Sequence, residues 1–153
     1  MDNLRGKFLD DFKVGDTYLT PARTVTEADV CLFAGLTGDY NPLHTNEEWA
    51  KANSVFKTRI AHGLLGLTIL SGLINQIGFM EGTTLAVVET REKFQGAIHF
   101  GDTLVGHVTV TEVKPSSSKP DRGILKKECE LRNQKGEVVI WHEQVILMRR
   151  KVS

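Results

Sequence analysis

The sequence has few features that favour disulfide bonding, zinc binding or nucleic-acid binding. Its two cysteines, Cys31 and Cys129, lie far apart, without CxxC spacing and without an evident histidine partner. We therefore expect both to be reduced packing residues. Charge of neither sign is in excess, because 19 Lys and Arg residues balance 19 Asp and Glu residues. A nucleic-acid or anionic membrane partner is therefore not expected, since binding to phosphates requires an excess of positive charge.

Long apolar runs are also absent. No run approaches the roughly 20 residues that a membrane span requires, and residues 1–5 lack the basic-then-apolar layout of a signal peptide. These observations predict a cytoplasmic protein, with an organelle matrix as the alternative. A chain of 153 residues has the usual size of one domain, and no internal repeat or long linker divides it. We expect a single domain over residues 1–153.

Three patterns predict helices in the first half of the chain. Thr26 precedes Asp29 by three residues, as in a capping box, and predicts a helix of about ten residues that ends at the next pair of glycines. Thr45, three residues before Glu48, predicts the start of another short helix. Residues 63–77 are apolar almost all round, which is typical of a buried helix.

The rest of the chain predicts β-strands. Val108 and Val110 alternate with polar neighbours, as in a half-buried antiparallel strand. A sheet of such strands can bury the apolar helix by curling around it, which gives the α+β class. Periodicity alone does not distinguish this layout from other α+β folds. The expected strands are residues 17–25, 84–95, 103–113, 123–132 and 137–149.

The segment 33–44, Phe-Ala-Gly-Leu-Thr-Gly-Asp-Tyr-Asn-Pro-Leu-His, contains the candidate chemistry. Asp39 and His44 lie five residues apart in a loop where Pro42 fixes one φ angle and biases Asn41 away from helical angles. Such a loop can hold both side chains on one side. A carboxyl group with a pKa near ~4 and an imidazole near ~6.5 are common general acid-base groups, and two of them can share one water. Taken alone, Asp-Tyr-Asn-Pro is also typical of a structural turn.

The full segment, with Ala50 six residues after His44, resembles the signature of type-2 (R)-specific enoyl-CoA hydratases and of the wider MaoC-like dehydratase family. Ile-Ala-His-Gly at 60–63, before the apolar helix, and Gly-Asp-Thr-Leu at 101–104 also resemble that family. The resemblance covers most of the chain. Ala97 departs from it, since the family usually has proline there, and this departure concerns local loop shape.

This resemblance implies a hot-dog fold, in which a curved antiparallel sheet wraps a long central helix. It also implies hydration of trans-2-enoyl-CoA to (R)-3-hydroxyacyl-CoA, or the reverse dehydration, with no cofactor and no metal. A water held between Asp39 and His44 would attack the β-carbon while the α-carbon receives a proton on the same face. We assign His44 as the base and Asp39 as the proton donor, and the reverse assignment stays open because coupled groups share macroscopic pKa values. Asn41 would orient the pair, and the backbone N–H of Gly63 would stabilise the thioester oxyanion.

Other functions use the same fold. A thioesterase would need a carboxylate on the central helix, and residues 64–77 contain no Asp or Glu. A non-catalytic acyl-CoA-binding protein would be expected to lack Asp39 or His44. A 3-hydroxyacyl-[acyl-carrier-protein] dehydratase would use the same site and a basic rim for its acidic carrier. The candidate residues for that rim are Lys51, Lys57 and Arg59.

For the remaining histidines we expect structural or surface roles and not catalysis. His62, next to the start of the central helix, is expected to be structural, with a second base or a ligand as the alternative. His99, His107 and His142 lack partners at metal-ligand spacing, and we expect surface or cavity-wall roles for them.

A sheet curled around one helix leaves strand edges open, and pairing two sheets covers them. The resembled family associates in this way. We therefore expect a homodimer with two active sites, which takes an acyl-CoA or acyl-carrier thioester as its substrate.

Overall fold

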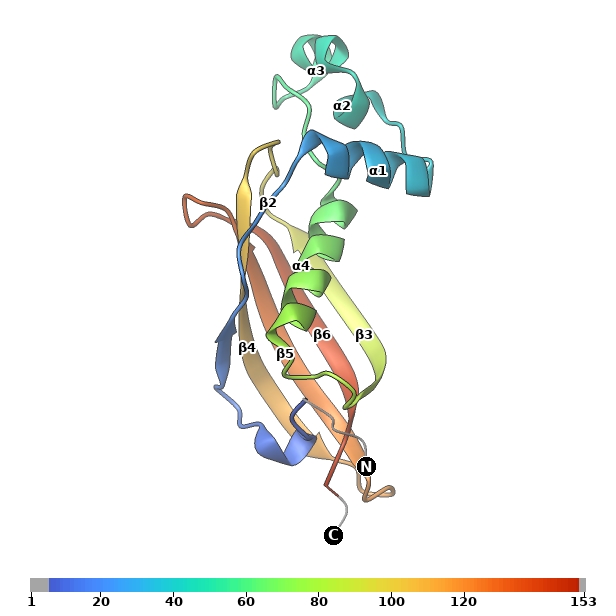
Figure 1. Cartoon of the computed structure of the whole chain (residues 1–153), viewed down its shortest axis with the longest axis vertical. Helices are drawn as coiled ribbons and strands as arrows, with labels where there is room; N and C mark the ends of the chain where they lie inside the picture. Colours follow the sequence, from blue (N-terminus) through green and yellow to red (C-terminus); the bar gives the residue numbers. More distant parts are fainter. Residues whose placement is uncertain (1–5, 152–153) are drawn as a thin grey trace.

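The computed structural model describes residues 6–151, so that residues 1–5, considered above for a signal peptide, lie outside the described residues. One antiparallel sheet of six strands curves around the long helix α4, Gly63–Ile77 (Figure 1). The strand order is β1-β4-β5-β6-β3, and the short β2 pairs with β4. This arrangement confirms the α+β class and the hot-dog fold. The strands are β1 Thr17–Leu19, β2 Arg23–Thr24, β3 Thr84–Phe94, β4 Thr103–Pro115, β5 Arg122–Arg132 and β6 Val138–Arg149.

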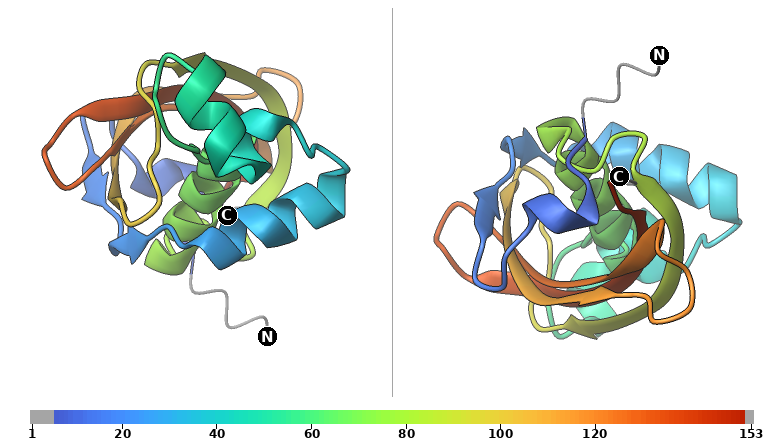
Figure 2. Two further views of the ribbon diagram at one scale, coloured as in Figure 1. Left: turned by 90° about the horizontal axis from the view of Figure 1, so that it is seen from above. Right: turned by 90° about the horizontal axis from the view of Figure 1, so that it is seen from below.

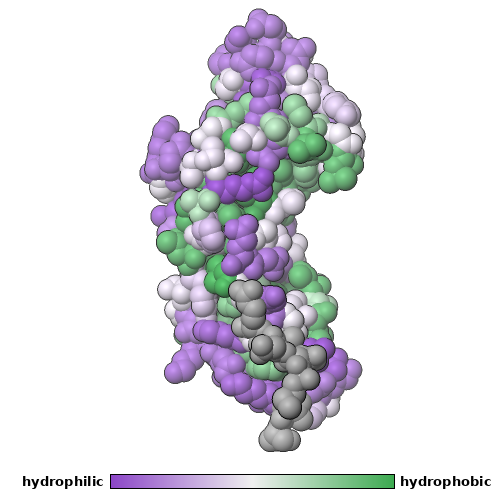
Figure 3. Space-filling model, in the orientation of Figure 1, coloured by the Kyte–Doolittle hydropathy of each residue, from purple (hydrophilic) through white to green (hydrophobic). Residues whose placement is uncertain are grey.

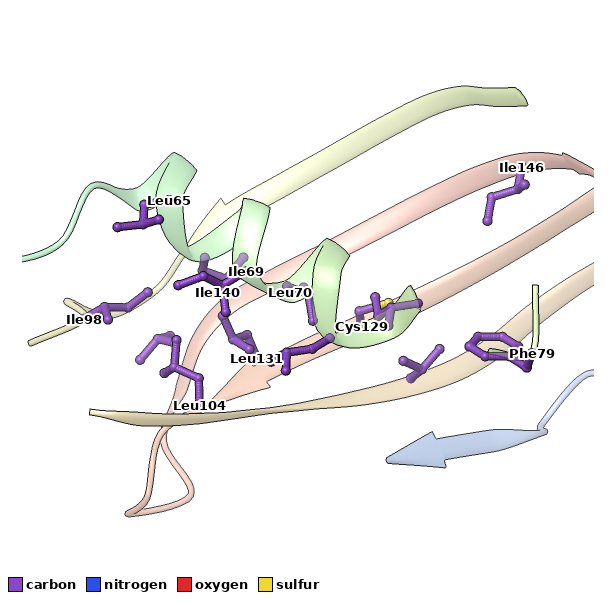
Figure 4. Packing of buried hydrophobic residues seen from close by; sticks show 14 of the residues in the cluster. Leu65, Ile69, Leu70, Phe79, Ile98, Leu104, Cys129, Leu131, Ile140 and Ile146 are labelled. Carbon is purple, nitrogen blue, oxygen red and sulfur yellow. The ribbon is translucent and has the colours of Figure 1, made fainter. Parts of the chain in front are cut away.

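The hydrophobic core lies between α4 and the concave face of the sheet (Figures 2 and 4). Alternate residues of β4 and β5 are buried, as the two-residue period of a strand predicts. Leu70 of α4 packs in the same cluster as Leu104, Leu131 and Ile140 from the strands. The other buried residues of α4 are Leu65, Gly66, Ile69, Leu73 and Ile74.

Two expectations about burial are wrong. The helix α4 is not buried all round, because the sheet covers only one of its faces and Leu64 remains 60% exposed. Cys31 is exposed on α1, Glu27–Thr37, so it is not a packing residue, whereas Cys129 is buried in the core. The sheet therefore leaves the face of α4 that carries Leu64 open.

The predicted helix starts are confirmed in one case and shifted in another. Thr26 caps α1 and forms the capping box with Asp29. The start of α3, Glu47–Asn53, is capped by Asn46 and not by Thr45, whose hydroxyl donates to backbone carbonyls one turn earlier. A further short helix, α2 at Pro42–Thr45, was not predicted. The expected strand at 17–25 is divided into β1 and β2, and a 3-10 turn lies at Leu9–Asp11.

The helices α1, α2 and α3 gather at one end of the molecule, around the N-terminus of α4 (Figure 1). The loop between α1 and α3 therefore lies over the first turn of the central helix. Within residues 6–151, no helix is both long enough and apolar enough to cross a membrane.

Candidate active site

The loop that carries Asp39 and His44 is shaped by helix ends. The helix α1 ends at Gly38, whose φ of 78° lies in the left-handed region where glycine is favoured. Asn41 then caps α2 by accepting a hydrogen bond from the Leu43 N–H, and proline occupies the first position of that helix. The chain thus reverses between the two residues, as the proline-containing loop predicts.

Asp39 is half exposed, with 53% of its side chain accessible. Its Oδ1 atom accepts a hydrogen bond of 3.2 Å from the backbone N–H of Asn41. Asn41 was expected to orient the catalytic pair. It does contact the Asp39 carboxylate, but through its backbone, because its side chain is used to cap α2.

His44 is held in one tautomer. Its Nδ1 lies 2.7 Å from the carbonyl oxygen of Ile60 and must carry the proton of this hydrogen bond, because a carbonyl can only accept. In the neutral ring, Nε2 then has a free lone pair. Burial lowers the pKa of His44 below its usual value of about 6.5, and the neighbouring His62 adds to this effect, while the bond to Ile60 and the charge of Asp39 oppose it. His44 is therefore neutral at pH 7 and available as a base.

This shift predicts the titration of His44. We expect its midpoint below pH 6.5, so that the neutral base persists under mildly acidic conditions and is lost as the pH falls further. In Asp39→Asn the midpoint should fall further, because the carboxylate charge raises this pKa. An NMR titration of the His44 ring protons, assigned with His44→Ala, measures both values. A midpoint at or above 6.5, or a rise in Asp39→Asn, would contradict this account.

His62 joins the loop to α4. Its ring is buried, and Nε2–H donates a hydrogen bond of 2.9 Å to the backbone carbonyl of Asp39. The ring lies against that of His44, with 3.8 Å between centroids, and against Phe33 on α1. These contacts support the structural role that we expect for His62.

Asp39, His44 and His62 offer ligand atoms that all lie within 4.8 Å of one another, so we considered them as a metal site. Catalytic zinc sites use three protein ligands. Here His62 Nε2 is already bonded to the Asp39 carbonyl, so His62 could bind a metal only through Nδ1, which is buried and makes no hydrogen bond in the described chain. The residues of this cluster fit an acid-base pair with a bracing histidine better than they fit a metal centre.

Gly63 lies at the first position of α4, directly after His62. Backbone N–H groups in the first turn of a helix have no partner within the helix and point along its positive end. Among the described residues, the Gly63 N–H donates no hydrogen bond. A Cβ atom at this position would lie 2.8 Å from the ring of Phe94, so glycine permits this close approach. Gly63 and Phe94 both line a cavity of about 260 Å³.

The sequence matches a known family over most of its length. The family model described as MaoC like domain matches residues 11–130. The chain belongs to the MaoC-like domain family. Among its relatives, this MaoC-like chain is 39% identical to an (R)-specific enoyl-CoA hydratase from Rhodospirillum rubrum over 114 residues, which are 74% of the chain and 76% of the relative.

Two further comparisons agree. A 3-hydroxybutyryl-CoA dehydratase from Methylorubrum extorquens is 31% identical over 115 residues, which cover 75% of this chain and 71% of that protein. The crystal structure of a MaoC-like dehydratase from Rhodospirillum rubrum superposes with a TM-score of 0.83 at 31% identity, covering 97% of this chain and 100% of that one. The resemblance inferred from the motif is thus confirmed at the level of the family.

Two residues of the site escaped the sequence analysis of this MaoC-like chain. Ile60 acts through its backbone carbonyl, which no side-chain pattern can reveal. Phe94 ends a strand, and an aromatic residue there carries no signal of a contact with Gly63. Ala97, the departure from the family pattern, lines the same cavity as Gly63. His107 is exposed, and His142 lines a separate cavity.

Proposed function

We propose that this chain is a hydro-lyase that hydrates the double bond of a trans-2-enoyl thioester, or catalyses the reverse dehydration, with Asp39 and His44 as its acid-base pair. The main support is the bond between His44 Nδ1 and the Ile60 carbonyl, which leaves Nε2 as a free base beside Asp39. Relatives named as a hydratase and as a dehydratase support the reaction class.

In this mechanism His44 Nε2 removes a proton from water as the water oxygen bonds to the β-carbon. The electrons of the double bond move toward the thioester carbonyl, the proton on His44 Nε2 passes to the Asp39 carboxylate, and Asp39 delivers it to the α-carbon. Both groups end in their starting protonation states, so that the net change is the addition of one water. Positioned proton transfer of this kind contributes roughly 10²- to 10⁴-fold to a rate.

Charge that develops on the thioester oxygen needs a donor. The Gly63 N–H is the candidate, because it has no other partner among the described residues and lies at the positive end of α4. It follows His62 directly in the chain, and His62 lies against His44. The mechanism requires an oxyanion donor close to the acid-base pair, and Gly63 meets this requirement through its neighbour His62.

The decisive assay follows the loss of conjugated thioester absorbance when purified protein is added to crotonyl-CoA. We expect syn addition, because one loop holds both Asp39 and His44 and covers a single face of the alkene. The relative named (R)-specific enoyl-CoA hydratase supports (R)-3-hydroxybutyryl-CoA as the product. Reaction in deuterated water, chiral chromatography and the α/β NMR coupling of the product report the stereochemistry. An anti adduct would exclude a shared water, while a syn (S) product would overturn only the orientation of the acyl chain.

A carrier-protein dehydratase is the second candidate, and the basic rim that it needs is only weakly present. Arg59 is bound to Glu27 and Glu47, at 2.6 and 3.3 Å. Lys51 is bound to Glu48 at 2.9 Å. Two of the three candidate cations are thus paired with acids of the same chain, so the rim offers little unpaired positive charge to an acidic carrier helix.

We also propose that the chain is one domain that works as a homodimer. The strand β3 forms one edge of the sheet, and its residues Val87 and Val88 are exposed. Apolar side chains gather on α1 and near β3, on either side of a hollow (Figure 3). A second copy would cover this surface and the open face of α4.

Light scattering of the active enzyme should give twice the mass of one chain. Val88→Lys should shift the equilibrium toward monomer, because it places a charge at the proposed interface. Val14→Lys, at an exposed apolar position away from β3, is the matched control and should stay dimeric. A fully active monomer would contradict the proposal.

A further inference from the structure

A cavity of about 680 Å³ lies between α4 and the strands β3, β5 and β6. Its wall is mostly apolar but carries several polar side chains. Thr68, Ser71 and Asn75 face it from α4. Neither Asp39 nor His44 belongs to this wall, so the proposed mechanism leaves its polar groups unexplained.

The polar residues of the sheet form two adjacent rows across three strands. In one row Lys127 on β5 pairs in register with Gln144 on β6, which pairs with Thr90 on β3. In the next row Cys129, His142 and Glu92 are aligned in the same way. All but Cys129 line the cavity. The two rows interrupt the otherwise apolar concave face of the sheet.

Lys127 differs from the other residues of the two rows because it is a basic residue that is fully buried. Its side chain is fully buried, on the same face of β5 as the core residues Leu125 and Leu131. Within residues 6–151, its Nζ makes one polar contact, 3.8 Å from Cys129 Sγ, and no ion pair. The next residue, Lys126, faces the other way and pairs with Glu143 at 2.9 Å. The chain thus provides an acid for the partly exposed lysine and none for the buried one.

A buried ammonium group without an anion is unfavourable, and burial accordingly lowers the pKa of Lys127. An anion entering the cavity would restore the charged form. His142 stands beside Lys127 in the next row, and its Nδ1 makes no hydrogen bond in the described chain although Glu92 Oε1 lies 3.5 Å away. Glu92 lines the same cavity from β3, two strands away, and forms no ion pair with Lys127 in the described chain.

The cavity begins one helical turn along α4 from Gly63, the proposed oxyanion donor. Gly63, Leu67, Ser71 and Asn75 are spaced four residues apart, so they form a row that turns gradually around α4, and the last three line the cavity. Leu67 is one helical turn, about 6 Å, beyond Gly63. An acyl chain whose thioester oxygen is bound at Gly63 would have to pass Leu67 to enter this cavity.

We propose that this cavity binds a carboxylate at the far end of the acyl group, so that the preferred substrate is a trans-2-enoyl thioester of a dicarboxylic acid. Lys127 supplies the positive charge, and Gln144, Thr90 and His142 supply the hydrogen bonds. A single lysine suits a carboxylate, whereas phosphate groups are typically bound by arginines or by several backbone N–H groups. This inference rests on the proposed hydration.

The experiment compares kcat/KM for trans-2-hexenedioyl-CoA and trans-2-hexenoyl-CoA, and for the corresponding octenedioyl and octenoyl pair. The wild-type enzyme should prefer the carboxylate in at least one pair by about tenfold, the ratio expected from one charge-assisted hydrogen bond. In Lys127→Met that ratio should fall to one or below, because the carboxylate would be buried without a cation. Lys126→Met is the matched control and should keep the wild-type ratio.

The outcomes separate the two proposals. Hydration of the methyl-ended thioesters without any preference for the carboxylates overturns this inference alone, as does an unchanged ratio in folded Lys127→Met. Failure to hydrate any of the four thioesters overturns the proposed function and the inference with it. If circular dichroism shows that Lys127→Met does not fold, the wild-type ratios still decide.

Discussion

Replacing His44 with alanine, or Asp39 with asparagine, is expected to lower kcat for enoyl-thioester hydration by about 10² or more. Each change removes one proton-transfer group from the pair. Asp39→Asn keeps the oxygen that accepts from the Asn41 N–H and the backbone carbonyl that binds His62, so the loop should hold its shape. Circular dichroism and a crotonyl-CoA assay measure folding and rate together.

The matched control for the histidine is His107→Ala, on the exposed side of β4. This variant loses the same side chain outside the candidate site and should retain wild-type activity. Near-normal turnover in either His44→Ala or Asp39→Asn would remove that residue from the acid-base pair.

The double variant distinguishes a shared water from two independent groups. If Asp39 and His44 act on one water, the loss of either disables the same step, and the double variant should lose little beyond the worse single variant. Multiplication of the two single effects would mean that the residues act separately. The cluster that brings their side chains within 4.8 Å of each other favours the shared step.

Local signals in the sequence predicted the parts of this fold that depend on neighbouring residues. Thr26 with Asp29 marked the start of α1, and the apolar run located α4 at its observed bounds. The start of α3 was missed by one residue, because Thr45 and Asn46 are both good caps and only the preceding turn of α2 decides between them. The sequence does not show that competition.

Features of the fold and site that depend on long-range contacts could not be predicted from the sequence. The periodicity of α4 indicated burial all round, yet exposed Leu64 shows that a single chain covers only one face. The partner of His44 Nδ1 is a backbone carbonyl sixteen residues away. The two-residue period of β5 puts Lys127 on the face of Leu125 and Leu131, but only the register of β5 with β6 shows that it lines the cavity of about 680 Å³. Such features depend on tertiary structure, and residue spacing does not encode them directly.

Removal of the Gly63 N–H is expected to lower kcat by about 10² to 10³, the cost of losing one oxyanion donor. Proline removes this donor while remaining compatible with the helix, because the first position of a helix tolerates proline. The preceding residue, His62, already has a φ of −60° and a ψ of 136°, which are angles that a residue before proline adopts readily. Gly63→Pro therefore tests the donor with little change to the backbone.

Steric clash is the main confounding effect, since any Cβ at position 63 approaches the Phe94 ring at 2.8 Å. Gly63→Ala adds the same Cβ but keeps the N–H, so the ratio between the two variants isolates the donor. Both are best made in a Phe94→Ala background, where the clash is removed. If Gly63→Pro and Gly63→Ala then lose activity equally, the N–H of Gly63 is not the oxyanion donor, and the loss comes from the added Cβ itself. A loss confined to proline, in kcat more than in KM, would place the stabilised charge in the transition state, where a helix N-terminus has its largest effect.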